Sequence, residues 1–131
     1  MAMVNNAVRV PCNDLNAFFK YWLLFLEPFH KMSTREIEVA ACFLKHRYLY
    51  SLDVLNPTIV EKLSMNEETK RIIAEECNLT SAYFQVMMSK LRKSKFVIDG
   101  KINPRFIPNI SSENFSLLIH FEINNFNGQD V

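Results

Sequence analysis

Glycine is almost missing from this chain: only 2 of its 131 residues are glycine, Gly100 and Gly128. A loop that cradles a nucleotide phosphate needs several closely spaced glycines, so the sequence holds no phosphate-binding loop of that kind. Phenylalanine, in contrast, occurs 11 times. The shortage of glycine and the abundance of phenylalanine together predict a densely packed, mainly helical protein.

Cysteine is scarce as well, with three residues at widely separated positions, Cys12, Cys42 and Cys77. Because their number is odd and their surroundings are apolar, we expect reduced, buried thiols in an intracellular protein. None of them is spaced from a histidine in the way that zinc ligands are. The sequence therefore predicts no metal site.

No group of residues in the sequence has the pattern of a catalytic site. The histidines, His30, His46 and His120, are isolated, and we interpret His46 and His120 as structural or solvent-facing. Neighbouring carboxylates such as Glu67 and Glu68 stand beside lysine and arginine, as they do on a solvated helix face. We therefore expect a protein that is not an enzyme and that uses no cofactor.

Long apolar runs are also lacking. The most apolar stretch, residues 18–26, is too short to cross a membrane, and Lys20 interrupts it, which argues against a secretion signal. The net charge of +1 indicates little about partners by itself. These features predict no membrane partner and a cytoplasmic location.

The chain is long enough for one domain with a single core, which we place at residues 13–124. An arm over 1–12 precedes this domain and a polar tail over 125–131 follows it. Residues 115–124 alternate between apolar and polar side chains, which predicts a long β-strand. The pattern leaves open whether this strand pairs within the chain or with another chain.

The first predicted helix spans residues 14–26, with Asn13 as its cap and Pro28 ending it. Its apolar side chains cover more than one face, which is typical of a helix buried on several sides. Two interpretations remain open: a central core helix, or an interface between subunits. The candidate interface residues are Phe18, Trp22 and Phe25.

Ser33 and Glu36 form a capping-box pattern that predicts a second long helix, ending near Ser51. An asparagine followed by a proline predicts a short helix over 57–63, because proline is favoured at the first helical position.

Residues 67–95 follow the pattern of a helix-turn-helix, with a first helix that ends at Cys77 and a second that follows its cap, Thr80. Ala74 is small enough to let the two helices approach closely, and Asn78 tolerates the left-handed conformation of a tight turn. Apolar residues at the matching offsets are predicted to fill the wedge between the helices: Ile73, Cys77, Leu79, Phe84 and Met87.

Residues 96–108 are predicted to contain a small hairpin, because strand-forming residues flank an Asp99-Gly100 turn. A helix-turn-helix followed directly by such a hairpin resembles the winged-helix DNA-binding proteins, including those of phages and plasmids. The resemblance covers residues 70–108. It implies a mainly α fold with a small β component, in which a winged helix-turn-helix carries an added N-terminal helix and a C-terminal strand.

The resemblance also implies that helix 80–95 enters the major groove of double-stranded DNA while basic side chains contact phosphates. Residues 81–105 contain six basic residues and one acidic residue, in agreement with this role. Gln85 is suited to read adenine through two hydrogen bonds, and Ala82 or Val86 to touch a thymine methyl group. The predicted DNA-binding residues are Ser81, Gln85, Ser89, Lys90, Arg92, Lys93, Lys95, Lys101 and Arg105.

A near-neutral net charge and an aromatic first helix fit a second function. A winged helix can serve as a packing module, for example in a ring at the head–tail junction of a phage virion. Its partners would then be protein subunits, including copies of itself, and its location the virion. The composition is common in AT-rich bacterial and phage proteins. For either function we expect a homo-oligomer from a phage or a bacterium, with DNA binding in the cytoplasm of the bacterial or phage-infected cell.

Overall fold

The computed structural model describes residues 9–110, 115, 117, 122 and 123. Most of the predicted strand over 115–124 lies outside these residues, as do the tail over 125–131 and positions 1–8 of the predicted arm. Positions 9–12, the described part of the arm, belong to no helix or strand.

The described residues form a mainly helical structure with one small β-sheet, as the sequence predicts. The sheet is an antiparallel pair in which Val97 lies opposite Ile102 and Ile98 lies opposite Lys101. The elements in chain order are α1 (Leu15–Phe25), α2 (Glu27–His30), α3 (Thr34–Asp53), α4 (Pro57–Ser64), α5 (Glu67–Glu76), α6 (Ser81–Lys93), β1 (Val97–Ile98), β2 (Lys101–Ile102) and the 3-10 helix η1 (Pro104–Phe106).

The long helix α3 is the centre of the core. Its first turn has the predicted capping box, in which the Ser33 hydroxyl accepts from the Glu36 N–H and the Glu36 carboxylate accepts from the Ser33 N–H. All residues from 39 to 44 are buried, so this stretch of the helix is covered on every side. Two of them, Ala40 and Ala41, have side chains small enough to let the neighbouring helices approach closely.

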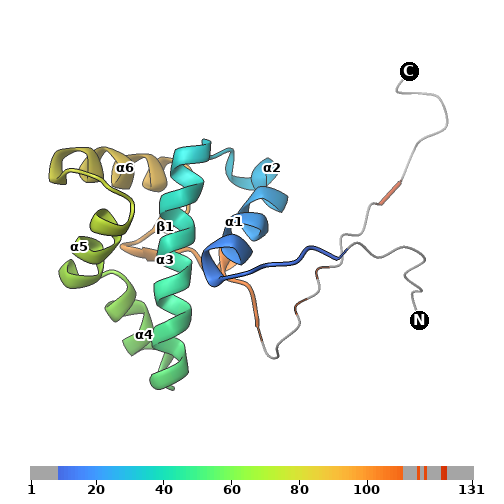
Figure 1. Ribbon diagram of the computed structural model, residues 1–131, viewed down its shortest axis with the longest axis horizontal. Coiled ribbons are helices and arrows are strands. Elements are labelled where there is room, and N and C mark those ends of the chain that lie inside the picture. Colours follow the sequence, from blue (N-terminus) through green and yellow to red (C-terminus); the bar gives the residue numbers. More distant parts are fainter. Residues whose placement is uncertain (1–8, 111–114, 116, 118–121, 124–131) are drawn as a thin grey trace.

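The other helices surround α3 on two sides (Figure 1). α1 and α2 lie on one side, whereas α5 and α6 lie on the other, and α4 packs near the C-terminal end of α3. The β1–β2 hairpin follows α6, contacting that helix through β1 and α4 through β2. Because α1 and α6 both pack on α3, this central helix sets the position of each of them.

The first helix differs from its prediction at both ends. Asp14, and not Asn13, is the cap, since its carboxylate accepts from the Ala17 N–H at 2.7 Å. The helix ends at Phe25, before Pro28, and a second short helix, α2, begins at Glu27. The prediction that Pro28 ends the helical segment is therefore wrong. Pro28 lies in the first turn of α2, where a missing N–H costs no hydrogen bond.

Other helix ends differ from the predicted ones by one or two residues. α3 continues to Asp53, and α5 stops at Glu76, one residue early. The second helix of the predicted pair over 80–95 ends at Lys93. It cannot include Lys95, whose φ of 69° is left-handed and incompatible with a right-handed helix.

The turn between α5 and α6 forms around Asn78, which has the expected left-handed conformation with φ of 55°. The Asn78 N–H donates to the Glu75 carbonyl at 3.1 Å, and the Leu79 N–H donates to the Ala74 carbonyl at 2.8 Å. Together these bonds make the Schellman pattern that closes a helix C-terminus. Thr80 then caps α6 by accepting a hydrogen bond from its first turn, as predicted.

The hairpin turn also agrees with the sequence. Asp99 and Gly100 have φ values of 52° and 73°, which is the pair of left-handed residues that a tight two-residue hairpin turn requires. On the strands, Val97 and Ile102 are buried against the core, so the hairpin is held in place by apolar packing as well as by its own hydrogen bonds.

We predict that replacing Asn78 by alanine lowers the free energy of unfolding by about 1 kcal/mol, because a Cβ-bearing residue without the polar side chain disfavours the left-handed region. Replacing Asn78 by glycine should leave the stability within about 0.5 kcal/mol of the original, since glycine adopts this φ freely. Urea unfolding of the three proteins measures both effects. Equal stability of the alanine and glycine variants would contradict this account of the turn.

Candidate nucleic-acid interface

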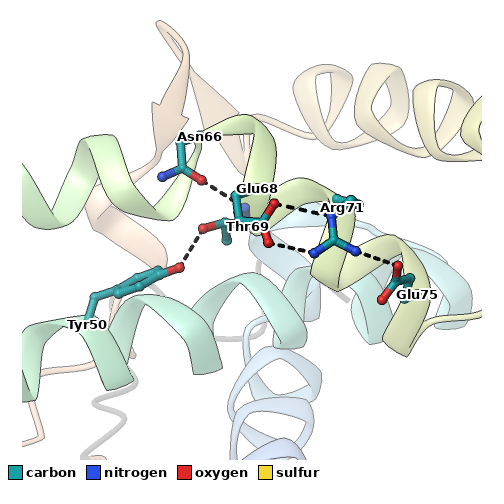
Figure 2. A network of polar contacts seen from close by, with 6 residues as sticks. All are labelled: Tyr50, Asn66, Glu68, Thr69, Arg71 and Glu75. Carbon is teal, nitrogen blue, oxygen red and sulfur yellow. Dashed lines mark hydrogen bonds and ion pairs between the residues drawn. The ribbon is translucent and has the colours of Figure 1, made fainter.

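The start of α5 is anchored to α3 by a buried threonine (Figure 2). The Thr69 hydroxyl lies 2.6 Å from the Tyr50 hydroxyl and donates to the Leu63 carbonyl at 2.7 Å. The Thr69 N–H donates to the side chain of Asn66, which caps α5. Because Thr69 is completely buried, these bonds satisfy a polar group that water cannot reach, and they fix where α5 begins.

The outer face of α5 carries charges that pair among themselves (Figure 2). Arg71 contacts Glu68 and Glu75, each at 2.6 Å. Lys70 lies 3.7 Å from Glu67 on the same helix. The basic residues of α5 thus have carboxylate partners on the helix itself, closely for Arg71 and weakly for Lys70, as the sequence indicated for the Glu67-Glu68 pair.

The end of α5 is tied to α3 by a second set of polar contacts. Arg35 donates to the Cys77 carbonyl. Glu76 accepts from Lys45 at 2.7 Å and lies 2.8 Å from the His46 Nε2. Burial alone would raise the pKa of the Glu76 carboxyl, but the hydrogen bonds from Lys45 and His46, with their charges, hold that pKa below its usual value. His46 therefore has a structural role in this contact.

The five residues predicted to fill the wedge between α5 and α6 all pack in the core. Ile73, Cys77, Phe84 and Met87 are buried, and Leu79 packs against the core as a half-buried side chain. Because α6 packs on α3, a defined set of its residues faces outward.

The outward face of α6 is polar at its start and mixed along its length. The residues predicted to face a DNA groove are all exposed: Ser81, Ala82, Gln85, Val86 and Ser89. Two large apolar residues of this helix face outward, Tyr83 and Val86, at 44% and 45% exposure, whereas Met88 is buried at 2%.

Basic side chains cluster at the end of α6 and beyond it. Lys90, Arg92, Lys93 and Lys95 are all exposed. In the described part of the chain, no acidic side chain forms an ion pair with any of these four residues. They therefore differ from the basic residues of α5, whose charges are paired.

The two remaining predicted phosphate contacts already have partners within the chain. Lys101 on β2 lies 3.9 Å from the Glu61 carboxylate of α4, a distance that leaves the pair weak at an exposed site. The Arg105 guanidinium lies over the ring of Phe29, 5.3 Å from its centroid. Both side chains stay at the surface, but their charges are less free than those at the end of α6.

The predicted subunit-interface residues do not share one surface. Phe18 and Trp22 are half-buried and pack on the chain's own core, and the Trp22 indole N–H donates to the Phe106 carbonyl at 2.8 Å. Phe25 faces outward, with 55% of its surface exposed. The sequence did not identify its exposed apolar neighbours on α1 and α2: Tyr21, Leu24 and Phe29. A helical projection of α1 would have placed the first two beside Phe25.

The histidines show why isolated residues are weak signals of function. The His30 Nε2 lies 2.7 Å from the Leu23 carbonyl, and its Nδ1 accepts from the Met32 N–H at 2.9 Å. His30 thus joins α1, α2 and the chain leading to α3, which is a structural role. His120 lies outside the described residues.

No protein-family model, curated protein or solved structure was found that matches this chain. Over the described ranges, no helix is both long enough and apolar enough to span a membrane.

We predict that Glu76 stabilises the fold at neutral pH and loses this effect in acid. Since its pKa is lower in the folded chain than its ordinary value of 4.5, its contribution is present above about pH 4.5 and disappears as the pH falls through the folded-state pKa. Urea unfolding should show Glu76→Gln less stable than the original protein at pH 7, with a smaller difference at about pH 3. The matched control is Glu67→Gln, whose side chain is 93% exposed and should matter little at either pH. A difference that is independent of pH would contradict the prediction.

Proposed function

We propose that this chain is a non-enzymatic winged-helix protein that binds double-stranded DNA through α6 and the β1–β2 hairpin. In this interpretation α5 and α6 are the helix-turn-helix, α6 is the recognition helix, and the hairpin is the wing. The turn geometry at Asn78 and the left-handed pair Asp99-Gly100 support this assignment.

The observation that carries the proposal is the unequal pairing of basic side chains. Arg71 of α5 and Lys45 of α3 form ion pairs with carboxylates of α5. In contrast, four basic residues at the end of α6 are exposed and form no ion pair with an acidic residue in the described part of the chain: Lys90, Arg92, Lys93 and Lys95. Each unpaired cation is free to displace a counterion from a DNA phosphate, which is the main source of affinity for DNA. The exposed face with Ser81, Gln85 and Ser89 lies on the same helix, so groove contacts and phosphate contacts would be made together.

The apolar side chains on this face suit the proposed ligand. Val86 and Ala82 are exposed and adjacent on the outer face of α6, where they would meet a thymine methyl group without leaving a buried polar atom unpaired. The face lacks arginine and lysine near the start of α6, so contacts to guanine are not expected there. We therefore propose a preference for A·T-rich sites.

We predict that Lys93→Ala weakens binding to an A·T-rich duplex several-fold and reduces the slope of log affinity against log salt by about one, because one phosphate contact is lost. Lys101→Ala should act in the same direction but less strongly, since Lys101 is near Glu61. Fluorescence anisotropy at several salt concentrations measures both quantities.

The matched control is Lys20→Ala, which removes an exposed positive charge from α1, on the side of α3 away from α6 (Figure 1). Its affinity and salt slope should equal those of the original protein. If all three variants lose affinity equally, the binding is a general charge effect and the assignment of α6 is wrong. If the original protein shows no salt-dependent binding, the proposed function is wrong.

A second function is favoured by the exposed apolar face of α1 and α2, which consists of Tyr21, Leu24, Phe25 and Phe29. These side chains are 42% to 60% exposed, whereas Phe19 and Leu23 on the opposite face of α1 are buried in the core. Large adjacent apolar side chains at a surface are typical of contacts between proteins. The alternative proposal is a structural subunit, such as a ring component at a virion head–tail junction, that assembles through this face.

If the alternative is correct, the original protein forms an oligomer and Phe25→Asp is a monomer, because a charge in an apolar contact is costly to desolvate. The control is Leu55→Asp, which changes a residue that is 93% exposed and lies between α3 and α4. It should assemble normally. Light scattering over a range of concentrations gives the mass, and circular dichroism checks that each variant is folded. An original protein that stays monomeric throughout would exclude this function.

A further inference from the structure

Two cysteines that lie far apart in the sequence meet in the core. The Cys42 Sγ on α3 lies 3.4 Å from the Cys77 Sγ at the C-terminal end of α5, across a sequence separation of 35 residues. Both are free thiols, and each retains 7% of its surface exposed. The sulfur atoms are thus in contact, and the contact joins the central helix to the turn that precedes α6.

The surroundings of the two thiols are not equivalent. The hydrogen bond with Cys42 lowers the pKa of the Cys77 thiol against the effect of burial, and the nearby positive charge of Arg35 lowers it further. The hydrogen bond with Cys77, together with burial, raises the pKa of the Cys42 thiol. Cys77 is therefore the thiol that ionises first, and Cys42 stays protonated beside it.

We propose that Cys42 and Cys77 are a site of reversible oxidation, at which a small hydroperoxide converts the two thiols into a disulfide that links α3 to the turn before α6. This proposal goes beyond DNA binding and does not depend on it. The sequence predicts three buried thiols. Cys42 and Cys77 are buried but in contact with each other, whereas the prediction is wrong for Cys12, which is exposed because it lies in the segment before α1.

The chemistry proceeds in two balanced steps. Cys77 first releases its thiol proton, and its thiolate attacks one oxygen of hydrogen peroxide as the O–O bond breaks. Cys77 becomes a sulfenic acid, and the departing hydroxide takes up the released proton to give one molecule of water. The Cys42 sulfur then attacks the Cys77 sulfur, the S–O bond breaks, and the Cys42 proton leaves with the departing hydroxide as a second water. Two thiols are oxidised and one peroxide is reduced.

The required movement is small. A disulfide bond is about 2.05 Å long, so the sulfur atoms must approach by about 1.4 Å from their observed separation of 3.4 Å. Cys77 directly precedes Asn78, and its carbonyl accepts a hydrogen bond from Arg35. The new bond would therefore hold the turn to α3 at a point already fixed by a polar contact, and it would constrain the unfolded chain over the segment between the two cysteines.

The experiment uses the full chain with Cys12→Ser, since Cys12 is exposed and would otherwise react between molecules. The folded protein is treated with hydrogen peroxide, and its mass is measured under non-reducing conditions before and after dithiothreitol. We expect a loss equal to two hydrogen atoms, a proteolytic fragment pair joined through Cys42 and Cys77, and recovery of both thiols on reduction. The oxidised form should also unfold several degrees higher than the reduced form.

Two further variants, Cys42→Ala and Cys77→Ala in the same background, provide the controls. Peroxide should give no intramolecular crosslink in either, and a trapping reagent for sulfenic acid should label the Cys42→Ala protein at Cys77. Thiols that remain free in the folded Cys12→Ser protein would overturn the proposal, as would oxidation of one cysteine to a sulfinic acid without a crosslink. A crosslink that appears only after unfolding in urea would overturn it as well.

Discussion

Residues 39–44 of α3 are buried without interruption, and this is the constraint on which the remaining structure depends. Six consecutive residues of an α-helix point in every direction around its axis, so the helix needs apolar cover on all sides. α1 supplies this cover on one side, and α5 and α6 supply it on the other. Ala40 and Ala41 let the covering helices come close, whereas Phe43 and Leu44 fill the space between them.

A helix buried in this way also serves as a frame for the surface that we propose to bind DNA. α5 is fixed to α3 at both ends, through Thr69 at its start and through the contacts of Arg35 and Glu76 at its end. The Schellman turn and the packing of α6 on α3 then determine the direction of α6. Apolar burial provides most of the stability, and these polar contacts select one arrangement among the many that would bury similar area.

The distribution of charge follows from the same arrangement. Carboxylates of α5 pair with the basic residues beside them and with Lys45 of α3, so the negative charge of α5 already has partners within the chain. The end of α6 has no such neighbours among the described residues and keeps its positive field. A net charge near zero can therefore hide a strongly basic surface, because net charge sums over the molecule whereas a ligand meets only one face.

Features that depend on neighbouring residues could be predicted before the fold was known. The capping box at Ser33, the left-handed turn at Asn78, the Asp99-Gly100 hairpin and the buried positions of the wedge were all predictable, because each follows from local backbone energetics or from helical spacing. One local choice could not be made from the sequence: Asn13 and Asp14 are both good caps, and the structure uses Asp14.

Which face of an evenly apolar helix is covered depends on how the whole chain packs. Trp22 and Phe25 are both large aromatic residues of α1, so the sequence does not tell which of them is buried. Trp22 packs inward and donates a hydrogen bond to the Phe106 carbonyl, whereas Phe25 is exposed. The same packing also decides which charges are paired and that Cys42 meets Cys77. These contacts join residues 30 to 84 positions apart, and no local pattern specifies them, because they depend on how separate helices settle around α3 to bury it.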